Sequence, residues 1–313
     1  ADPVAGFYRD RTITFMIGSD PGGAFDAYAR LLSEAMPRYL PGAPKIIVKY
    51  TGGQSGGLQL AEMMQNVAPR DGSIMAMTTQ SVVVHQMLRP DFARYDARQW
   101  SWLGNMAPQR SVLSVWHTAR ARTIDEARRG EAIMGATAQT SPTYFIPDLM
   151  NKFIGTKYRI VTGYKNVVDL NLAMQRGEIE GRASSWLSII YNMADDYAAG
   201  RVKPLVVSAI SRQPEIADVP TLAELMSDPA HRRVAEFISA ESDYGRSVFL
   251  PPGVPVERIE ALRAAFAAAL RDPALLAEAR KINAPIEYMS AGALEELTRK
   301  VTSTPREALD YAR

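Results

Sequence analysis

Short apolar runs alternate with amphipathic segments along the first third of the chain. The runs at residues 12–18, 45–51 and 73–79 have the length and the β-branched content of buried strands. The segments at 25–36 and 58–66 repeat apolar residues at helical spacing. This order predicts a parallel sheet built from alternating strands and helices.

A second pattern of the same kind begins at Ser111. Strands are expected at 111–116, 131–137, 158–164, 177–183 and 203–209, and helices are expected from Ser141 and Pro142, over 167–176 and from the segment DVPTLAEL at 218–225. The remaining C-terminal part is mostly helical, with Pro255 in a first turn and an apolar face made by Ile259, Leu262, Phe266 and Leu270. Since such helices need a sheet to cover, we expect the chain to return to the first sheet, with residues 246–252 beside it.

The predicted fold class is therefore α/β with two lobes, each a mainly parallel sheet flanked by helices, and a ligand cleft between the lobes. Lobe I is expected to comprise residues 1–106 and 228–313, and lobe II residues 107–227, with two chain crossings between them. A length of 313 residues fits two domains.

Composition and charge exclude several classes of protein. The net charge is +2 from 36 basic and 34 acidic residues, without a basic stripe, so no nucleic-acid partner is expected. There is no cysteine, which excludes disulfide scaffolds and thiolate metal sites. His85, His117 and His231 lack metal-ligand spacing, and no P-loop or G-x-G-x-x-G occurs, so neither a metal nor a cofactor is predicted. No run of about 18 apolar residues could span a bilayer. The start ADPVAGFYRD predicts a mature chain after signal-peptide removal, although an engineered start would look the same.

Glycines and short polar residues follow the predicted strands at their carboxyl ends, where ligands bind in open α/β sheets. Glycine lets a ligand approach the main chain, and the amides that begin a helix favour anions. The sequence thus predicts a small anion held mainly by neutral donors. The predicted ligand-binding residues are Ser19, Asp20, Gly22, Gly23, Ala24, Phe25, Asp26, Thr79, Gln80, Ser81, Thr137, Gln139, Thr140, Ser141, Tyr144, Arg182, Ser184, Ser185 and Trp186.

Some of these residues have a second interpretation. Asp26 is either a helix cap or the holder of an ordered water. Arg182 is either a fork for a carboxylate or a surface arginine paired with Glu178 or Glu180. Trp186, Tyr144 and Phe25 either line the pocket or belong to the core.

One stretch resembles a catalytic motif. GQSGG at 53–57 fits the nucleophile elbow G-x-S-x-G with Ser55 as nucleophile, and His231 follows in the required order. No HGG-type oxyanion segment precedes it, and a glycine-rich helix entry explains the same residues. No catalytic residue is predicted, and a serine hydrolase remains the alternative function.

Six motifs in a fixed order resemble those of the solute-binding proteins of tripartite tricarboxylate transporters, the TctC/Bug family. They cover almost the whole chain: PGGAFDAYARLL (21–32), TGGQSGG (51–57), APRDGSIMAMTT (68–79), LAMQRGEIEG (172–181), DVPTLAEL (218–225) and FLPPGVPVERIEALRAAFAAALRDP (249–273).

The resemblance implies a periplasmic binding protein of type II-like, Venus-flytrap form. Such a receptor is no enzyme; it is expected to capture a small organic carboxylate by hinge closure, as a monomer, and to deliver it to membrane permease subunits. The resemblance assigns the carboxylate-gripping turn to 22–26 and the second-lobe donors to 137–141. Presentation of the ligand to a membrane sensor is a further alternative.

Three departures from the family pattern concern the substrate. GRASSW at 181–186 has Arg182, Ser184 and Ser185 where the family often carries an aspartate. Asp20 stands where a small or apolar residue is usual. The segment 226–246 looks like an insertion near a lobe crossing. The identity of the carboxylate is therefore left open.

Overall fold

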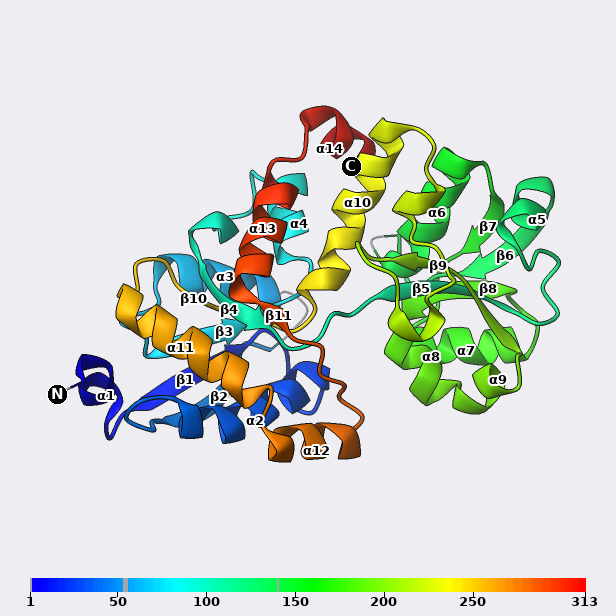
Figure 1. The fold of residues 1–313 in the computed structure, drawn as a ribbon. Helices are drawn as coiled ribbons and strands as arrows, with labels where there is room; N and C mark the ends of the chain where they lie inside the picture. The colour runs from blue at the N-terminus through cyan, green and yellow to red at the C-terminus, as the bar shows by residue number, and fades with distance from the viewer. Residues whose placement is uncertain (1, 53–55, 140) are drawn as a thin grey trace. The chain divides into compact units, whose positions relative to one another are not determined.

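The computed structural model describes residues 2–52, 56–139 and 141–313, and contacts divide the chain into two compact units (Figure 1). The first unit takes residues up to 108, residues 244–304 and Arg313, and the second takes 109–243 and 305–312. The chain thus passes between the units at 108/109, 243/244, 304/305 and 312/313. The lobes expected from the sequence differ from these units at 107–108, 228–243 and 305–312.

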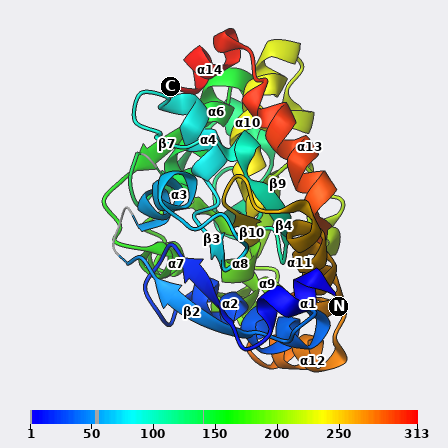
Figure 2. The ribbon, with the colours of Figure 1, turned by 90° about the vertical axis from the view of Figure 1, so that its left-hand side faces the viewer.

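The first unit is built on one six-stranded sheet. Its strand order is β11-β4-β10-β3-β1-β2. The strands are β1 (Thr12–Ile17), β2 (Lys45–Tyr50), β3 (Ile74–Met77), β4 (Ser101–Asn105), β10 (Ser247–Leu250) and β11 (Met289–Ser290). Figure 2 shows β10, from late in the chain, between β3 and β4. The predicted return of residues 246–252 to the first sheet is confirmed, and β10 lies within the sheet.

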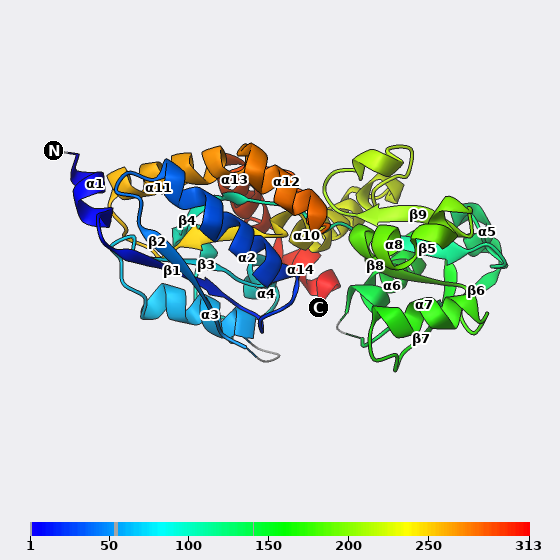
Figure 3. The ribbon, with the colours of Figure 1, turned by 90° about the horizontal axis from the view of Figure 1, so that it is seen from below.

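Helices cover both faces of this sheet. They are α1 (Pro3–Tyr8), α2 (Ala24–Ala35), η1 (Met36–Tyr39), α3 (Gly56–Asn66), α4 (Val82–Leu88), η2 (Ala97–Gln99), α11 (Val256–Ala269), α12 (Pro273–Lys281) and α13 (Ala291–Thr302). Figure 3 shows α2, α11 and α12 on one side of the strands and α3 on the other. Leu262, Phe266 and Leu270 of the predicted apolar face are buried in the core beneath α11, and Ile259 packs against it.

The second unit contains a five-stranded sheet in the order β7-β6-β8-β5-β9. Its strands are β5 (Ser111–Trp116), β6 (Glu131–Gly135), β7 (Lys157–Val161), β8 (Gly181–Ser185) and β9 (Val202–Ser208). Its helices are α5 (Ile124–Arg129), α6 (Pro142–Ile154), α7 (Val167–Gln175), α8 (Trp186–Asn192), α9 (Ala194–Ala198), η3 (Pro214–Ile216), η4 (Ala223–Leu225), α10 (Pro229–Tyr244) and α14 (Arg306–Ala312). In Figure 1, α6 lies on one face of this sheet and α7 and α8 on the other.

The α/β class is confirmed, with one difference in the sheets. The strands β1, β2 and β3 are parallel, as are β6, β7 and β8, whereas β10, β11, β4, β5 and β9 pair antiparallel. Both sheets are therefore mixed. Of the antiparallel strands, β4 and β5 flank the passage at 108/109, and β10 follows the passage at 243/244.

Two predicted segments fold differently from the expectation. DVPTLAEL forms only the short 3-10 helix η4, because Thr221 pairs with Val207 and Leu222 N–H donates to the Val207 carbonyl at 2.8 Å. The insertion-like segment is the long helix α10. It packs on the second unit, where Ser242 Oγ donates to the Ser208 carbonyl oxygen at 2.7 Å.

In the part of the chain that the structure describes, no helix has both the length and the apolar character needed to cross a bilayer.

Candidate functional site

The carboxyl ends of three parallel strands meet at one edge of the first sheet. In the register, Ile17 of β1 lies between Tyr50 of β2 and Met77 of β3. The segments that follow are 18–23, 51–52 and 78–81. The structure therefore brings two groups of predicted site residues to the same edge, Ser19 to Asp26 and Thr79 to Ser81.

The turn before α2 exposes its main chain. Gly22 has φ +89°, a conformation that favours glycine. Gly23 is the N-cap of α2, and no side chain of the described residues caps this end of the helix. A Cβ atom built at either glycine would meet no atom within 4 Å. The main chain at these two glycines thus has open space beside it, and the amides that begin α2 have no side-chain cap, which suits the approach of an anion.

Asp26 shapes this turn from behind. The residue is 4% exposed, and its carboxylate accepts hydrogen bonds from Gly22 N at 2.8 Å, Tyr50 Oη at 2.8 Å and Arg30 Nε at 2.9 Å. Burial acts to raise the pKa of Asp26, but these donors outweigh it and the pKa is lowered. Asp26 is therefore ionised, and its carboxylate fixes the position of the Gly22 amide. The interpretation of Asp26 as the cap of α2 is therefore wrong, because no side chain of the described residues caps this helix.

Asp20 and the segment after β3 add polar groups beside this turn. Asp20 is exposed and packs against Gly52, where an added Cβ would come within 2.0 Å of Asp20 Oδ1. Thr79 Oγ1 and Ser81 Oγ hydrogen-bond each other at 3.1 Å. Thr79 and Gln80 also line a cavity of about 10 Å³ with Trp102 and Ser247, which is roughly the space of one water molecule.

Phe25 connects the turn to a buried cation. The Arg246 guanidinium carbon lies 4.2 Å from the centre of the half-buried Phe25 ring. Arg246 is 5% exposed, and burial lowers its pKa to about 10, which leaves it charged at neutral pH. Phe25 thus has a packing role under the turn, and a positive charge lies behind the start of α2.

The second unit repeats the arrangement of adjacent strand ends. Gly135 of β6 lies opposite Arg182 of parallel β8, so the segments after Gly135 and after Arg182 leave the sheet side by side. These segments begin α6 and α8, whose N-caps are Ser141 and Ser185. Predicted residues from both segments are thereby brought to one edge.

Three hydroxyl groups form a cluster at the start of α6. Ser141 Oγ lies 2.6 Å from Thr143 Oγ1 and 3.0 Å from Thr137 Oγ1, and it accepts from Thr143 N at 3.1 Å. Thr137 N donates to Thr143 Oγ1 at 3.0 Å. The cluster fixes the loop that carries the predicted donors. Gln139 in this loop is exposed, and Tyr144 is half-buried.

Replacing Ser141 with alanine should weaken ligand binding and also loosen this helix start. The loss of one donor to a carboxylate predicts an affinity cost of about 1–2 kcal/mol, and the loss of the N-cap predicts a stability cost of about 1 kcal/mol. Isothermal titration and chemical denaturation measure the two effects separately. Ser290→Ala, which removes the N-cap of α13 in the first unit, is the control that loses stability alone. Equal ligand affinity for both variants would remove Ser141 from the site.

Arg182 lies inside the second unit. It is 0% exposed, and Glu180, one of its two suggested partners, instead binds Arg120 at 2.8 Å. The other suggested partner, Glu178, has its ion pair with Arg176 at 3.9 Å. Ser184 at the end of the same strand is 5% exposed. Trp186 is 4% exposed and belongs to the core of this unit.

Two residues named from the sequence, Thr140 and the hydrolase nucleophile candidate Ser55, lie outside the described residues. The structure therefore tests neither Thr140 as a ligand-binding residue nor Ser55 as a nucleophile. Among the residues that are described, no three His, Cys, Asp or Glu side chains gather as metal ligands would.

Sequence reasoning missed several residues that support these edges. Arg30 could have been found, since a partner four residues after Asp26 is a helix-spacing signal. Thr143 follows Ser141 by two residues, the usual reach of a capping hydroxyl. Tyr50 becomes a neighbour of the turn through the pairing of β1 with β2, and Arg246 through the return of the chain to the first sheet. The spacing of residues along the sequence reveals neither contact.

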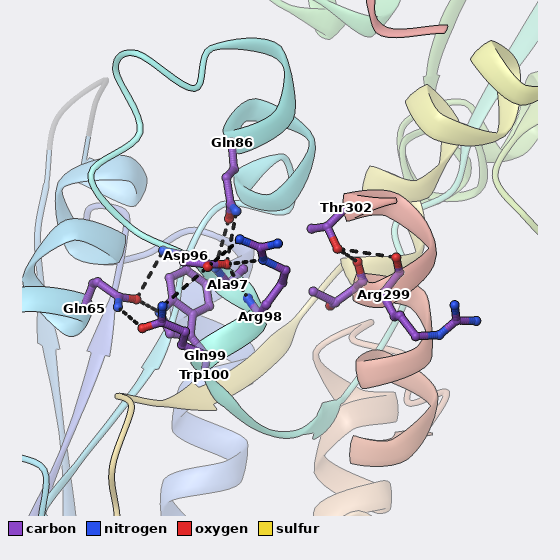
Figure 4. A network of polar contacts seen from close by, with 10 residues as sticks. Gln65, Gln86, Asp96, Ala97, Arg98, Gln99, Trp100, Arg299 and Thr302 are labelled. Carbon is purple, nitrogen blue, oxygen red and sulfur yellow. Dashed lines mark hydrogen bonds and ion pairs between the residues drawn. The ribbon is translucent and has the colours of Figure 1, made fainter. Parts of the chain in front are cut away.

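A larger hollow of about 280 Å³ lies elsewhere in the first unit, and none of the predicted site residues lines it. It is bordered by Ala97, Arg98, Trp100, Trp102, Glu295, Thr298, Arg299 and Thr302. Figure 4 shows the polar network beside it, in which Asp96 holds Arg98 and contacts Gln86 and Gln99. Arg98 pairs with Asp96, and Arg299 with Glu296. The cations of this hollow are thus neutralised by their own neighbours.

Comparisons with known proteins place the fold. No family model matches the chain. It is 24% identical over 272 residues to the "UPF0065 protein in tcbD-tcbE intergenic region" of Pseudomonas sp. strain P51, covering 85% of this chain and 76% of that protein. It superposes with a TM-score of 0.74 and 19% identity on a TctC solute-binding protein from Polaromonas, covering 98% and 100% of the two chains.

A third similar protein was solved with a ligand. MatC from Rhodopseudomonas palustris, with bound malate, gives a TM-score of 0.60 at 16% identity and covers 95% of this chain and 97% of its own. The resemblance found in the sequence motifs is thereby confirmed, and these likenesses establish the fold as that of solute-binding proteins.

Proposed function

We propose that this chain, which has the fold of the TctC/Bug solute-binding proteins, is an extracytoplasmic receptor for a small organic carboxylate. The observation that carries the proposal is the turn before α2: no described side chain caps the helix, open space lies beside Gly22 and Gly23, and Asp26 accepts a hydrogen bond from Gly22 N. The hydroxyl cluster at the start of α6 supplies neutral donors in the second unit. A carboxylate group accepts hydrogen bonds from such donors.

The proposed receptor acts in the periplasm and delivers its ligand to membrane permease subunits. One similar protein of known structure is a TctC solute-binding protein, and another, MatC, holds malate. The described site residues of each unit supply hydrogen-bond donors, such as the hydroxyl groups of Thr137 and Ser141. The function proposed for them is binding without chemistry.

A thermal-shift screen against mono-, di-, tri- and aromatic carboxylates tests this function. A ligand at 100 times its dissociation constant adds about 2.7 kcal/mol to the free energy of unfolding. We expect malate or a related dicarboxylate to raise the melting temperature. If no carboxylate shifts it, and mass spectrometry of the denatured protein finds no carboxylate bound from the start, the proposal fails.

The serine-hydrolase alternative has its own test. A fluorophosphonate probe labels a serine nucleophile that a base has activated. We expect Ser55 to remain unlabelled. Labelling that is lost in Ser55→Ala would establish the hydrolase instead.

A further inference from the structure

Arg182 is a buried cation without an acidic partner among the described residues. Its guanidinium donates to three neutral acceptors: Asn171 Oδ1, which lies 2.7 Å from Nε, Ser184 Oγ, and Met193 Sδ at 3.4 Å from Nη2. Six other arginines of the second unit do form ion pairs with an aspartate or glutamate: Arg120, Arg128, Arg159, Arg176, Arg201 and Arg212. The charge of Arg182 is thus compensated only by dipoles.

Such a burial is unfavourable for folding. A charge removed from water costs free energy unless an opposite charge or several hydrogen bonds replace the water. Burial lowers the pKa of Arg182 to about 9, so the guanidinium still carries its charge at neutral pH. An apolar side chain of similar size would fill this space at a lower cost, which points to a role outside folding.

The Arg182 guanidinium contacts Ser184, near the end of β8. Because the guanidinium donates to Ser184 Oγ, this oxygen serves as an acceptor and the hydroxyl hydrogen remains for another partner. The acceptor that the structure shows for it, the Ser185 carbonyl oxygen, lies 3.4 Å away, which is long for a hydroxyl donor. Ser184 stands beside the end of β6, at the edge where the predicted donors of this unit gather.

We propose that Arg182 is a positioning residue that makes this edge select ligands with a full negative charge. It polarises the Ser184 hydroxyl and attracts the carboxylate without touching it. This inference rests on the proposed receptor function and adds to it that the ligand group bound at Ser184 is an ionised carboxylate. A ligand presenting a neutral amide there gains nothing from Arg182.

The experiment compares charged and uncharged ligands in matched variants. Wild type, Arg182→Met, Arg182→Lys and Arg159→Met are titrated by calorimetry with the dicarboxylate that gives the largest thermal shift, and with its monoamide and diamide. Arg159 is exposed and pairs with Glu131 at 3.3 Å, so Arg159→Met repeats the change of net charge at the surface of the same unit.

We expect Arg182→Met to bind the dicarboxylate about tenfold more weakly or worse, with little change for the diamide. Arg182→Lys, which keeps the charge, should recover part of the affinity, and Arg159→Met should match wild type. The melting temperature of ligand-free Arg182→Met should equal or exceed that of wild type, because an uncompensated charge has been removed.

Two different failures are distinguishable. A wild-type protein that binds none of the carboxylates overturns the receptor function and this inference with it. A wild-type protein that binds them, while Arg182→Met and Arg182→Lys lose affinity equally for charged and neutral ligands, or lose none, overturns the role of Arg182 and leaves the receptor function standing. If Arg182→Met does not fold, Arg182→Lys and Ser184→Ala decide by the same comparison of dicarboxylate with diamide.

Discussion

Replacing Gly23 with valine should reduce the affinity for a carboxylate by about 100-fold or more, an effect of about 2.7 kcal/mol. The isopropyl group would stand in the open space over the amides that begin α2, where the ligand must approach the main chain. The fold should tolerate it, because Gly23 has an extended backbone with φ −89° and ψ −176°. The expected stability cost is about 1 kcal/mol, as for the loss of a favourable N-cap residue. Calorimetric titration and chemical denaturation measure the two quantities.

Two neighbouring variants frame this result. Gly23→Ala adds a single methyl group and should give a smaller loss of affinity at a similar stability. Gly22→Val introduces a β-branched residue at φ +89°, so it should lose stability as well as affinity. If Gly23→Val binds the ligand as tightly as wild type, the turn before α2 is not part of the site.

Removing the Asp26 carboxylate should have the largest effect on stability. Asp26→Ala leaves Gly22 N and Tyr50 Oη without their acceptor and separates Arg30 from its ion-pair partner. Arg30 is largely exposed, so its own contribution is small. The expected loss is about 2–3 kcal/mol in the free energy of unfolding. Because the Gly22 amide is no longer held, ligand affinity should fall too. Asp26→Asn, which keeps one oxygen acceptor, should show a smaller loss of both.

The pH dependence of stability checks the charge on Asp26. Its pKa is lowered in the folded protein from 3.8, so the unfolded chain takes up the proton first as the pH falls. The stabilisation by Asp26 is complete above pH of about 4 and is lost as the pH falls through the folded-state pKa. Wild type should therefore lose stability more steeply below pH of about 4 than Asp26→Asn does. Parallel acid profiles for the two proteins would show that Asp26 is not ionised in the fold.

The sequence predicted the elements whose signals are local. The strands before Gly18 and Gly135 and the helices after Gly23 and Ser141 could be located because apolar period, glycine turn and cap coincide there. DVPTLAEL was misjudged, since its pairing of Thr221 with Val207 depends on a strand 14 residues away. The segment 226–246 was noted only as an insertion near a lobe crossing, and most of it forms the helix α10.

The sequence predicted which strand ends form the site. It did not predict the buried side chains that pack behind them. That Ser19 and Thr79 share an edge follows from parallel strands. The inward direction of Arg182 does not, because a strand residue faces one of two sides and the sequence GEIEGRA offers acids that could pair with it on the surface. Arg246 reaches Phe25 only because β10 enters the first sheet from a distant part of the chain.

The first and the last helix of the chain belong to different units. The helix α1 belongs to the first unit, whereas Tyr311 of α14 lies in the second, where its ring is 6.1 Å from that of Phe153. Since the sequence contains no cysteine, one introduced in each terminal helix could be labelled without background. A donor and an acceptor dye placed there would turn any ligand-driven motion between the units into a change of energy transfer, so the chain itself provides the frame of an optical sensor for its ligand.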